Sequence, residues 1–129
     1  MRGRGRGWGR QGRGRRAVRM LEPVLLLLLH RGPSHGYTLL ERLKEFGLDD
    51  LNPSMVYRML RDMEAKGCVT STWDKEQTQG PPRRVYCLTA MGNDVLALWV
   101  QDLEESREQI DYLLAAYHRH MEEGEGEHH

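Results

Sequence analysis

Arginine dominates the chemistry available at the start of this 129-residue chain. Eight arginines precede the first acidic residue, Glu22, and within residues 1–16 they alternate with glycine around one large apolar residue, Trp8. A guanidinium stays charged at neutral pH, and its fork of N–H donors matches the oxygens of phosphate and carboxylate groups. A segment of this composition buries too little apolar surface to offset the entropy of ordering it. Residues 1–16 are therefore predicted to form a disordered Arg/Gly-rich arm that contacts a polyanion.

Acidic residues gather toward the other end of the chain. Between residues 102 and 127, nine acidic side chains are accompanied by only two arginines, Arg107 and Arg119. The formal net charge of zero therefore hides a basic front and an acidic back. Such asymmetry favours a polyanionic partner for the basic end, and nucleic acid is the leading candidate.

A second set of chemically useful side chains lies on a helix predicted near the middle of the chain. Asn52-Pro53 is a strong helix start and Gly67 a strong stop, which places this helix at about 53–66. Its apolar residues recur at helical spacing and are expected to face a core: Val56, Met59, Leu60 and Met63. The opposite face is polar, aromatic and basic, and carries Ser54, Tyr57, Arg58 and Arg61.

No residue pattern predicts catalysis, a cofactor or a metal site. The chain lacks a Ser/His/Asp arrangement, a carboxylate pair in a glycine-framed pocket and a phosphate-binding glycine loop, so we expect no enzyme activity. His35, beside Gly36, is interpreted as a turn histidine that satisfies backbone groups. No closed metal site is predicted from the spacing of the histidines near the acidic end, which are His118, His120, His128 and His129.

The elements that must position these side chains are mainly helical and fit one compact domain. An apolar helix is expected from about Pro23 to His30, and a second from about His35 to Phe46, capped by Ser34 and ended by Gly47. The apolar run Val24–Leu29 is far shorter than the ~20 residues that a bilayer span needs, and no signal-peptide cleavage pattern follows it. The protein is therefore predicted to be cytoplasmic.

A β-hairpin is predicted after the third helix. Residues 69–73 and 85–88 are rich in β-branched and aromatic side chains and flank a turn-rich loop, 74–82. Cys68 and Cys87 fall at these strands, and we interpret them as small hydrophobic residues, with a redox switch as the alternative.

A long helix of about 90–122, capped by Thr89, is predicted to close the chain. Six of its eight seam positions in a heptad pattern are large and apolar or aromatic: Leu96, Trp99, Leu103, Ile110, Leu113 and Tyr117. Such a helix is ~50 Å long, more than a small domain can cover, so the seam is expected to meet a second copy of itself. The predicted assembly is a homodimer.

Three helices, a hairpin with a basic loop and a long terminal helix follow the order of a winged helix-turn-helix, in which the third helix enters the major groove. Four segments, in the family's order, closely resemble the PadR family of transcriptional regulators: 33–37 (PSHGY), 52–60 (NPSMVYRML), 63–67 (MEAKG) and 80–92 (GPPRRVYCLTAMG). The similarity covers roughly residues 20–100. It implies a homodimeric winged-helix repressor of the family's shorter subgroup, which has a single terminal helix.

The resemblance also implies roles for particular residues. Ser54, Tyr57, Arg58 and Arg61 match the groove-facing side of the family's recognition helix, while Arg83 and Arg84 match its wing tip. Because related repressors bind planar drugs or phenolic compounds in aromatic cavities at the dimer interface, Trp99 is a candidate ligand-binding residue for a small-molecule effector.

The resulting prediction is a mainly α protein with a small β-hairpin that represses transcription as a homodimer on palindromic double-stranded DNA. Its expected organisation is an arm at 1–16, a winged helix-turn-helix DNA-binding domain at 17–89, a dimerisation helix at 90–123 and a disordered acidic tail at 124–129. One alternative is an RNA-binding or non-specific architectural protein that relies on the Arg/Gly arm. Another is a small-molecule carrier with a cavity beside Trp99.

Overall fold

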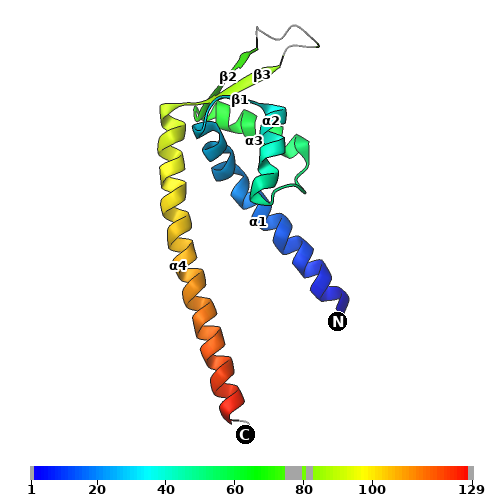
Figure 1. Ribbon diagram of the computed structural model, residues 1–129, viewed down its shortest axis with the longest axis vertical. Helices are drawn as coiled ribbons and strands as arrows, with labels where there is room; N and C mark the ends of the chain where they lie inside the picture. The colour runs from blue at the N-terminus through cyan, green and yellow to red at the C-terminus, as the bar shows by residue number, and fades with distance from the viewer. Residues whose placement is uncertain (1, 75–79, 81–82, 128–129) are drawn as a thin grey trace. The chain divides into compact units, whose positions relative to one another are not determined.

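The computed structural model describes residues 2–74, 80 and 83–127 (Figure 1). The elements follow one another as α1 (Arg2–His30), β1 (Ser34–His35), α2 (Gly36–Leu43), the 3-10 turn η1 (Lys44–Phe46), α3 (Pro53–Ala65), β2 (Val69–Trp73), β3 (Arg84–Leu88) and α4 (Ala90–Glu127). The chain divides into two units, Met1–Leu96 and Ala97–His129. The division falls inside α4, a few residues beyond the predicted domain boundary at residue 89.

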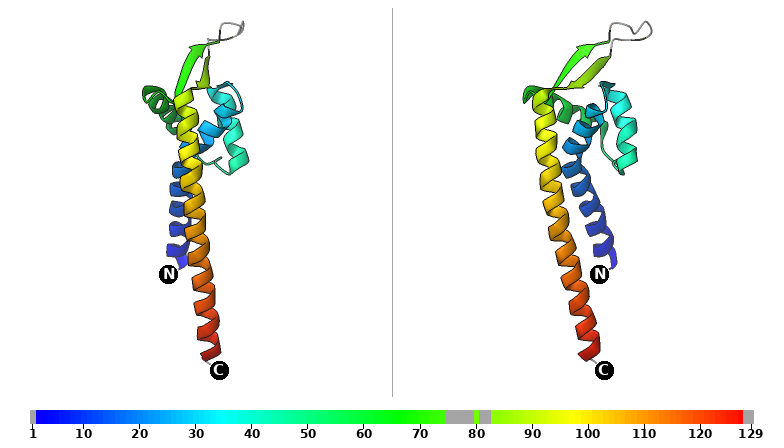
Figure 2. Two further views of the ribbon diagram at one scale, coloured as in Figure 1. Left: turned by 90° about the vertical axis from the view of Figure 1, so that its left-hand side faces the viewer. Right: turned by 60° about the vertical axis from the view of Figure 1, so that its left-hand side comes forward.

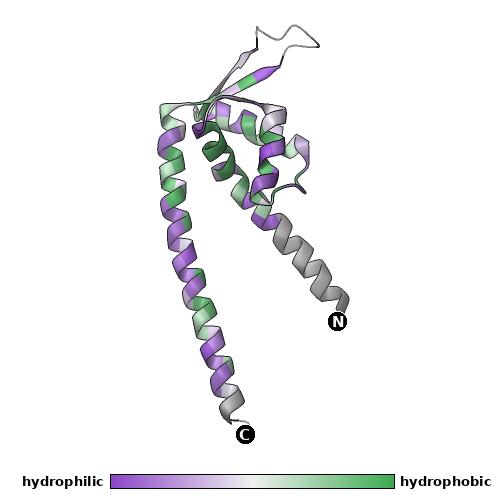
Figure 3. Cartoon of the chain, in the orientation of Figure 1, coloured by the Kyte–Doolittle hydropathy of each residue, from purple (hydrophilic) through white to green (hydrophobic). Residues whose placement is uncertain are grey.

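The core of the first unit is built around the leucine-rich half of α1. Leu21, Leu25 and Leu26 are completely buried, with no exposed surface. Figure 3 shows this apolar stretch where α1 passes the other two helices of the unit. The side chains that complete the core are Leu39 and Leu43 from α2, Val56, Leu60 and Met63 from α3, and Val69 from β2.

The start of α1 differs from the sequence-based prediction. We expected a disordered arm through residue 16 and a helix beginning near Pro23, whereas α1 begins at Arg2 and continues through Pro23. Extending a helix from an existing buried segment avoids the unfavourable nucleation step, and arginine is a good helix former. Pro23 itself is buried, although a proline inside a helix removes one backbone hydrogen bond.

The sheet contains one strand that the sequence did not predict. Its order is β1-β3-β2, and both pairs are antiparallel. Ser34 was expected to cap a helix over 35–46, but it lies in β1 opposite Tyr86. Consequently α2 begins at Gly36 and is followed by η1, while Gly47 ends this segment with a left-handed φ of 74° as predicted. Two residues are too few to show a strand pattern in a sequence.

The β2–β3 hairpin matches its predicted strands and projects away from the helices of its unit (Figure 2). Most of the predicted loop 74–82, namely 75–79 and 81–82, lies outside the described residues. Cys87 lies opposite Thr70 rather than Cys68, and both cysteines are free thiols. The interpretation of these residues as ordinary small side chains is consistent with the burial of Cys68.

The predicted caps of α3 and α4 are confirmed. The Asn52 side chain accepts a hydrogen bond from the Ser54 N–H at 2.9 Å, which satisfies one of the unpaired donors at the start of α3. Thr89 Oγ accepts from the Gly92 N–H at 3.0 Å and donates to the Gly67 carbonyl at 2.6 Å. Thr89 therefore starts α4 and ties it to the end of α3.

The second unit consists of α4 beyond residue 96. Within it, the predicted seam exposes large apolar side chains, with Ile110 at 55% and Leu113 at 67% exposure. The helix continues to Glu127, beyond the predicted start of a frayed tail at residue 124, while residues 128 and 129 lie outside the described part. Pairing of this seam with a second chain stays a prediction.

Gly92 provides a test of the junction between α3, β3 and α4. A Cβ on this buried residue would collide with the Cys68 carbonyl oxygen and the Leu88 side chain. We expect Gly92→Ala to lower the free energy of unfolding by ~1–3 kcal/mol in urea denaturation, because overpacking forces the surroundings to shift.

Gly124→Ala is the matched control, since no atom lies near the added methyl group. This change should stabilise the helix by up to ~1 kcal/mol. Equal unfolding midpoints for the two variants would contradict the close packing at Gly92.

Candidate nucleic-acid interface

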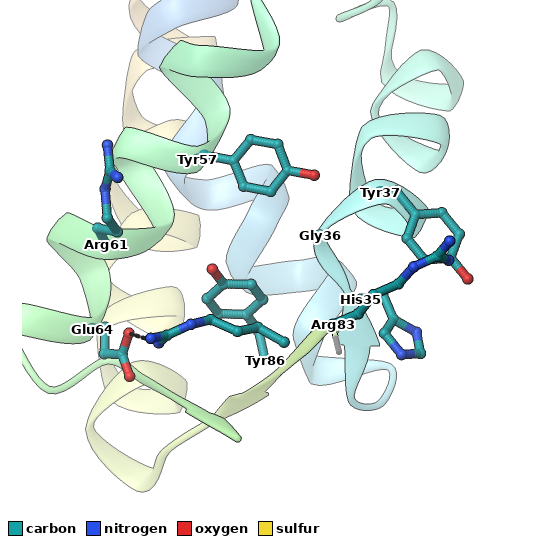
Figure 4. Close-up of a pocket in the computed structure, with 9 residues that line it drawn as sticks. His35, Gly36, Tyr37, Tyr57, Arg61, Glu64, Arg83 and Tyr86 are labelled. Carbon is teal, nitrogen blue, oxygen red and sulfur yellow. Dashed lines mark ion pairs between the residues drawn. The ribbon is translucent and has the colours of Figure 1, made fainter. Parts of the chain in front are cut away.

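A groove of about 960 Å³ opens between α3, the start of α2 and the first half of β3 in the β2–β3 hairpin (Figure 4). We call this hairpin the wing. The groove brings together residues from four elements and from the chain just before β3: His35, Gly36, Tyr37, Tyr57, Arg61, Glu64, Arg83, Arg84 and Tyr86. It therefore contains four of the six residues that the sequence singled out, two from α3 and two from the wing.

The side chains on the outward face of α3 are determined by which side chains of the helix are buried. Val56, Leu60 and Met63 are fully buried, and the same helix leaves the predicted polar, aromatic and basic side chains exposed: Ser54, Tyr57, Arg58 and Arg61. Tyr57 and Arg61 line the groove. Ser54 and Arg58 are not among the residues lining it, so the helix offers hydroxyl and guanidinium groups both inside the groove and beyond it.

Arg84 is held by a network within the protein. Its Nη1 donates to Ser71 Oγ at 2.8 Å and lies 3.8 Å from Glu64 Oε1. Ser71 Oγ in turn donates to the other Glu64 oxygen at 2.7 Å. The guanidinium carbon also lies 4.8 Å from the centre of the Trp73 ring, a cation–π contact. Arg84 is the first residue of β3, so it lies in the wing strand itself and the network fixes its direction.

Arg83 belongs to a second network, made of aromatic and polar contacts. Its guanidinium carbon lies 4.5 Å from the centre of the Tyr37 ring. Tyr37 stacks on His35 with 5.3 Å between ring centroids, and His35 Nε2 donates to Asp74 Oδ2 at 2.9 Å. The Asp74 N–H donates to the Arg83 carbonyl at 2.7 Å, which continues the β2–β3 ladder beyond the Trp73–Arg84 pair.

Tyr86 forms part of the groove's inner wall. Burial raises the pKa of its hydroxyl above the ordinary value of 10.0, and nearby Arg84 opposes this shift. Glu64 and Tyr57 add smaller upward contributions to the pKa, because negative charge beside a phenol disfavours its ionisation. The hydroxyl therefore stays protonated at neutral pH and can donate a hydrogen bond.

Several groove residues had no assigned binding role in the sequence. Glu64, Tyr37 and Tyr86 gave no signal of their own beyond the motifs that contain them. His35 was expected to satisfy backbone groups, whereas its ring bonds the Asp74 carboxylate, 39 residues away. Contacts at such separations depend on strand register, and residue spacing along the chain does not reveal them.

Two further properties bear on the earlier expectations. Among the residues that the structure describes, no three His, Cys, Asp or Glu side chains are grouped so as to hold a metal ion. Within the same residues, no helix is both long and apolar enough to span a membrane.

Comparison with known proteins assigns the chain to a family. The model of the PadR-like family of transcriptional regulators matches residues 24–98, more than half of the chain. The chain belongs to this family. The predicted fold class is thereby confirmed as a winged helix-turn-helix with a long C-terminal helix, and the PadR-like match includes both α3 and the wing. The comparison with curated proteins found no match.

Solved structures agree with this assignment. A conserved protein named as a potential transcriptional factor is 34% identical, with a TM-score of 0.68, 79% of this chain covered and 90% of the other. A transcriptional regulator from Thermoplasma acidophilum is 29% identical, with a TM-score of 0.67 and coverages of 78% and 96%. A PadR family regulator from Eggerthella lenta, 24% identical, shares the fold with a TM-score of 0.74 over 84% and 93% of the two chains.

The raised pKa of Tyr86 predicts a loss of stability at high pH. Above about pH 10 the unfolded tyrosine ionises while the folded one stays protonated, so the free energy of unfolding falls as the pH rises through the folded pKa. We expect Tyr86→Phe to remove this part of the pH dependence, measured by denaturant unfolding from about pH 8 to about pH 11, a range that includes the ordinary tyrosine pKa of about 10.

Tyr112→Phe is the control, because Tyr112 is 79% exposed. This change should leave the alkaline slope as it is in the wild type. If Tyr86→Phe and wild type lose stability in parallel, burial does not protect the Tyr86 hydroxyl.

Proposed function

We propose that this PadR-like protein is a sequence-specific DNA-binding repressor that acts as a homodimer on a palindromic operator. The observation that carries the proposal is the convergence of Tyr57 and Arg61 from α3 with Arg83 and Arg84 from the wing in one groove. Among the residues that the structure describes, three guanidinium groups and one carboxylate, Glu64, line that groove, so its charge favours a polyanion.

The chemistry of α3 suits a duplex groove. An arginine can donate two hydrogen bonds to the major-groove edge of guanine, while a hydroxyl group can bind a base edge or a phosphate oxygen. We assign base contacts to Tyr57, Arg58 and Arg61, and a phosphate contact to Ser54. Arg83 and Arg84 on the wing hold the neighbouring phosphates. Repression would then follow from occlusion of a promoter.

The homodimer is supported by the exposed apolar seam of α4. A solvent-exposed stripe of this kind on a long helix is typical of a surface that pairs with another helix. Two copies of α3 would then read two half-sites related by the dimer axis, which explains why the operator should be palindromic. The proposal includes a small aromatic effector that binds near Trp99. Such an effector would change the affinity for DNA by binding the DNA-free and DNA-bound conformations of the protein unequally.

The test of the proposal is the affinity for a duplex selected from random sequences. We expect the wild type to prefer it by ~10³ or more over unselected DNA. Tyr57→Ala and Arg58→Ala should each weaken binding to the selected duplex by ~1–3 kcal/mol, because they remove direct contacts from α3.

Arg119→Ala provides a control with the same loss of charge as Arg58→Ala, at a residue of the second unit that is not among those lining the groove. Its affinity for the selected duplex should equal that of the wild type. A folded Tyr57 or Arg58 variant with unchanged affinity would remove that residue from the interface. Absence of any preferred duplex would contradict sequence-specific repression.

Dimerisation should depend on the seam of α4. Ile110→Glu combined with Leu113→Glu places two charges in an apolar interface, where they would be desolvated without partners. We expect this variant to sediment as a monomer and to bind the operator more weakly.

Tyr112→Glu serves as the matched control, since Tyr112 is more exposed than either seam residue but points away from the seam by helical spacing. It should remain dimeric. A dimeric Ile110/Leu113 variant would show that the seam is not the interface.

The arginine arm, residues 2–16, should add affinity without sequence preference. Each phosphate contact adds ~0.9 to the slope of log affinity against log salt, so three to five contacts account for ~3–4. Deleting the arm leaves the buried segment that begins at Leu21 intact. At low salt, the truncated protein should bind both the selected and the random duplexes more weakly, by about the same factor. Its affinity should also depend less steeply on the salt concentration. An unchanged slope would exclude DNA contact by the arm.

A further inference from the structure

Three consecutive residues, the last of β1 and the first two of α2, contact three different parts of the candidate interface. His35 bonds Asp74 just after β2, Gly36 lies against Tyr57 of α3, and Tyr37 carries the guanidinium of Arg83 on its ring. Figure 4 shows their labelled partners arranged around this segment. The segment His35-Gly36-Tyr37 therefore touches both the recognition helix and the wing.

Gly36 leaves room for the Tyr57 side chain. Gly36 is buried, and a Cβ on it would lie 2.5 Å from Tyr57 Cε1 and 3.2 Å from the Tyr57 hydroxyl. Its φ is not among the positive values of the chain, so glycine is required for room rather than for backbone conformation. Tyr57 is 36% exposed, so its ring has solvent on one side. A methyl group at residue 36 would therefore displace the Tyr57 ring rather than the backbone.

The contacts at His35 and Tyr37 fix the wing. The His35–Asp74 hydrogen bond is partly buried, with about a quarter of each side chain exposed, so water competes with it less than at the surface. The Tyr37 ring contacts both His35 and Arg83, and Asp74 and Arg83 are joined through a backbone hydrogen bond. These contacts form a closed chain from β1 through the two wing ends and back to α2.

We propose that His35-Gly36-Tyr37 is the positioning segment of the interface. It sets the position of the wing and of the Tyr57 ring relative to α3, and so determines which groove geometry the protein accepts. Its residues act through others: Gly36 positions Tyr57, and His35 and Tyr37 position Asp74 and Arg83. Specific binding requires all contacts at once, whereas binding to random DNA needs only charge. Loss of positioning should therefore reduce specificity more than total affinity. This inference rests on the proposed DNA-binding function.

The first experiment is free of DNA and uses Trp73 on β2 as a reporter of the wing. In a background with Trp8→Phe and Trp99→Phe, Trp73 is the single tryptophan. We expect His35→Ala to release the wing and raise the acrylamide quenching constant of Trp73 about twofold, as the Arg84 contact with its ring loosens. His35→Gln keeps an N–H donor for Asp74 and should restore the wild-type quenching. His30→Ala, an exposed histidine at the end of α1, is the control.

The second experiment measures the ratio of affinities for the selected and random duplexes. Gly36→Ala and Tyr37→Leu should each lower this ratio by ~10-fold, comparable to one mismatched base pair, with little change in affinity for random DNA. Tyr37→Phe retains the ring under Arg83 and should keep the wild-type ratio. If a His35 variant does not fold, the Tyr37 pair decides the question in both experiments.

Two outcomes would overturn the inference. One is Trp73 quenching that does not respond to His35→Ala or to Tyr37→Leu. The other is a loss of affinity that is equal for selected and random duplexes, which would give the segment a merely structural role. Failure of the proposed function is distinguishable, because His35→Ala can still raise the Trp73 quenching constant in a protein that has no preferred duplex.

Discussion

The structure of the first unit depends on the burial of one leucine-rich segment of α1. Leu21, Leu25 and Leu26 have no exposed surface, and each buried leucine stabilises the fold by roughly 1.5–3 kcal/mol relative to leaving it exposed. α2, α3 and β3 all contact α1. Because α3 must turn Val56, Leu60 and Met63 inward to complete this core, its tyrosine and arginines are left on the outside. The surface chemistry of α3 is thus a consequence of the core.

The second constraint is electrostatic and acts at the loop end of the two wing strands. Arginines close together repel one another, and Glu64 offsets part of that repulsion while holding Arg84 through Ser71. The His35–Asp74 bond and the Tyr37–Arg83 contact organise the other arginine in the same way. Interfaces in which cationic side chains are fixed before binding lose less conformational entropy when they meet phosphate. The groove is therefore preorganised.

Local signals in the sequence were sufficient for much of this arrangement. Asn52-Pro53 and Gly67 indicate where α3 begins and ends, and Thr89 indicates the start of α4. β-Branched residues indicate the strands of the wing. Apolar spacing also separated Val56, Leu60 and Met63 from Tyr57 and Arg61. By contrast, β1 has two residues whose pairing is set by Tyr86 and Val85 far along the chain. The networks around Glu64 and His35 likewise join residues that are distant in sequence, and no local pattern indicates them.

The central claim is that the outward face of α3 lies against DNA bases. The most direct measurement places a photo-crosslinking side chain at residue 57, and separately at residue 112, in the full-length protein bound to its selected duplex. We expect the probe at residue 57 to crosslink to bases within each half-site, because α3 would lie in the major groove. The probe at residue 112, on the second unit, should not crosslink. Binding without crosslinks at residue 57, or with equal crosslinks at both residues, would contradict the assignment of α3 as the recognition helix.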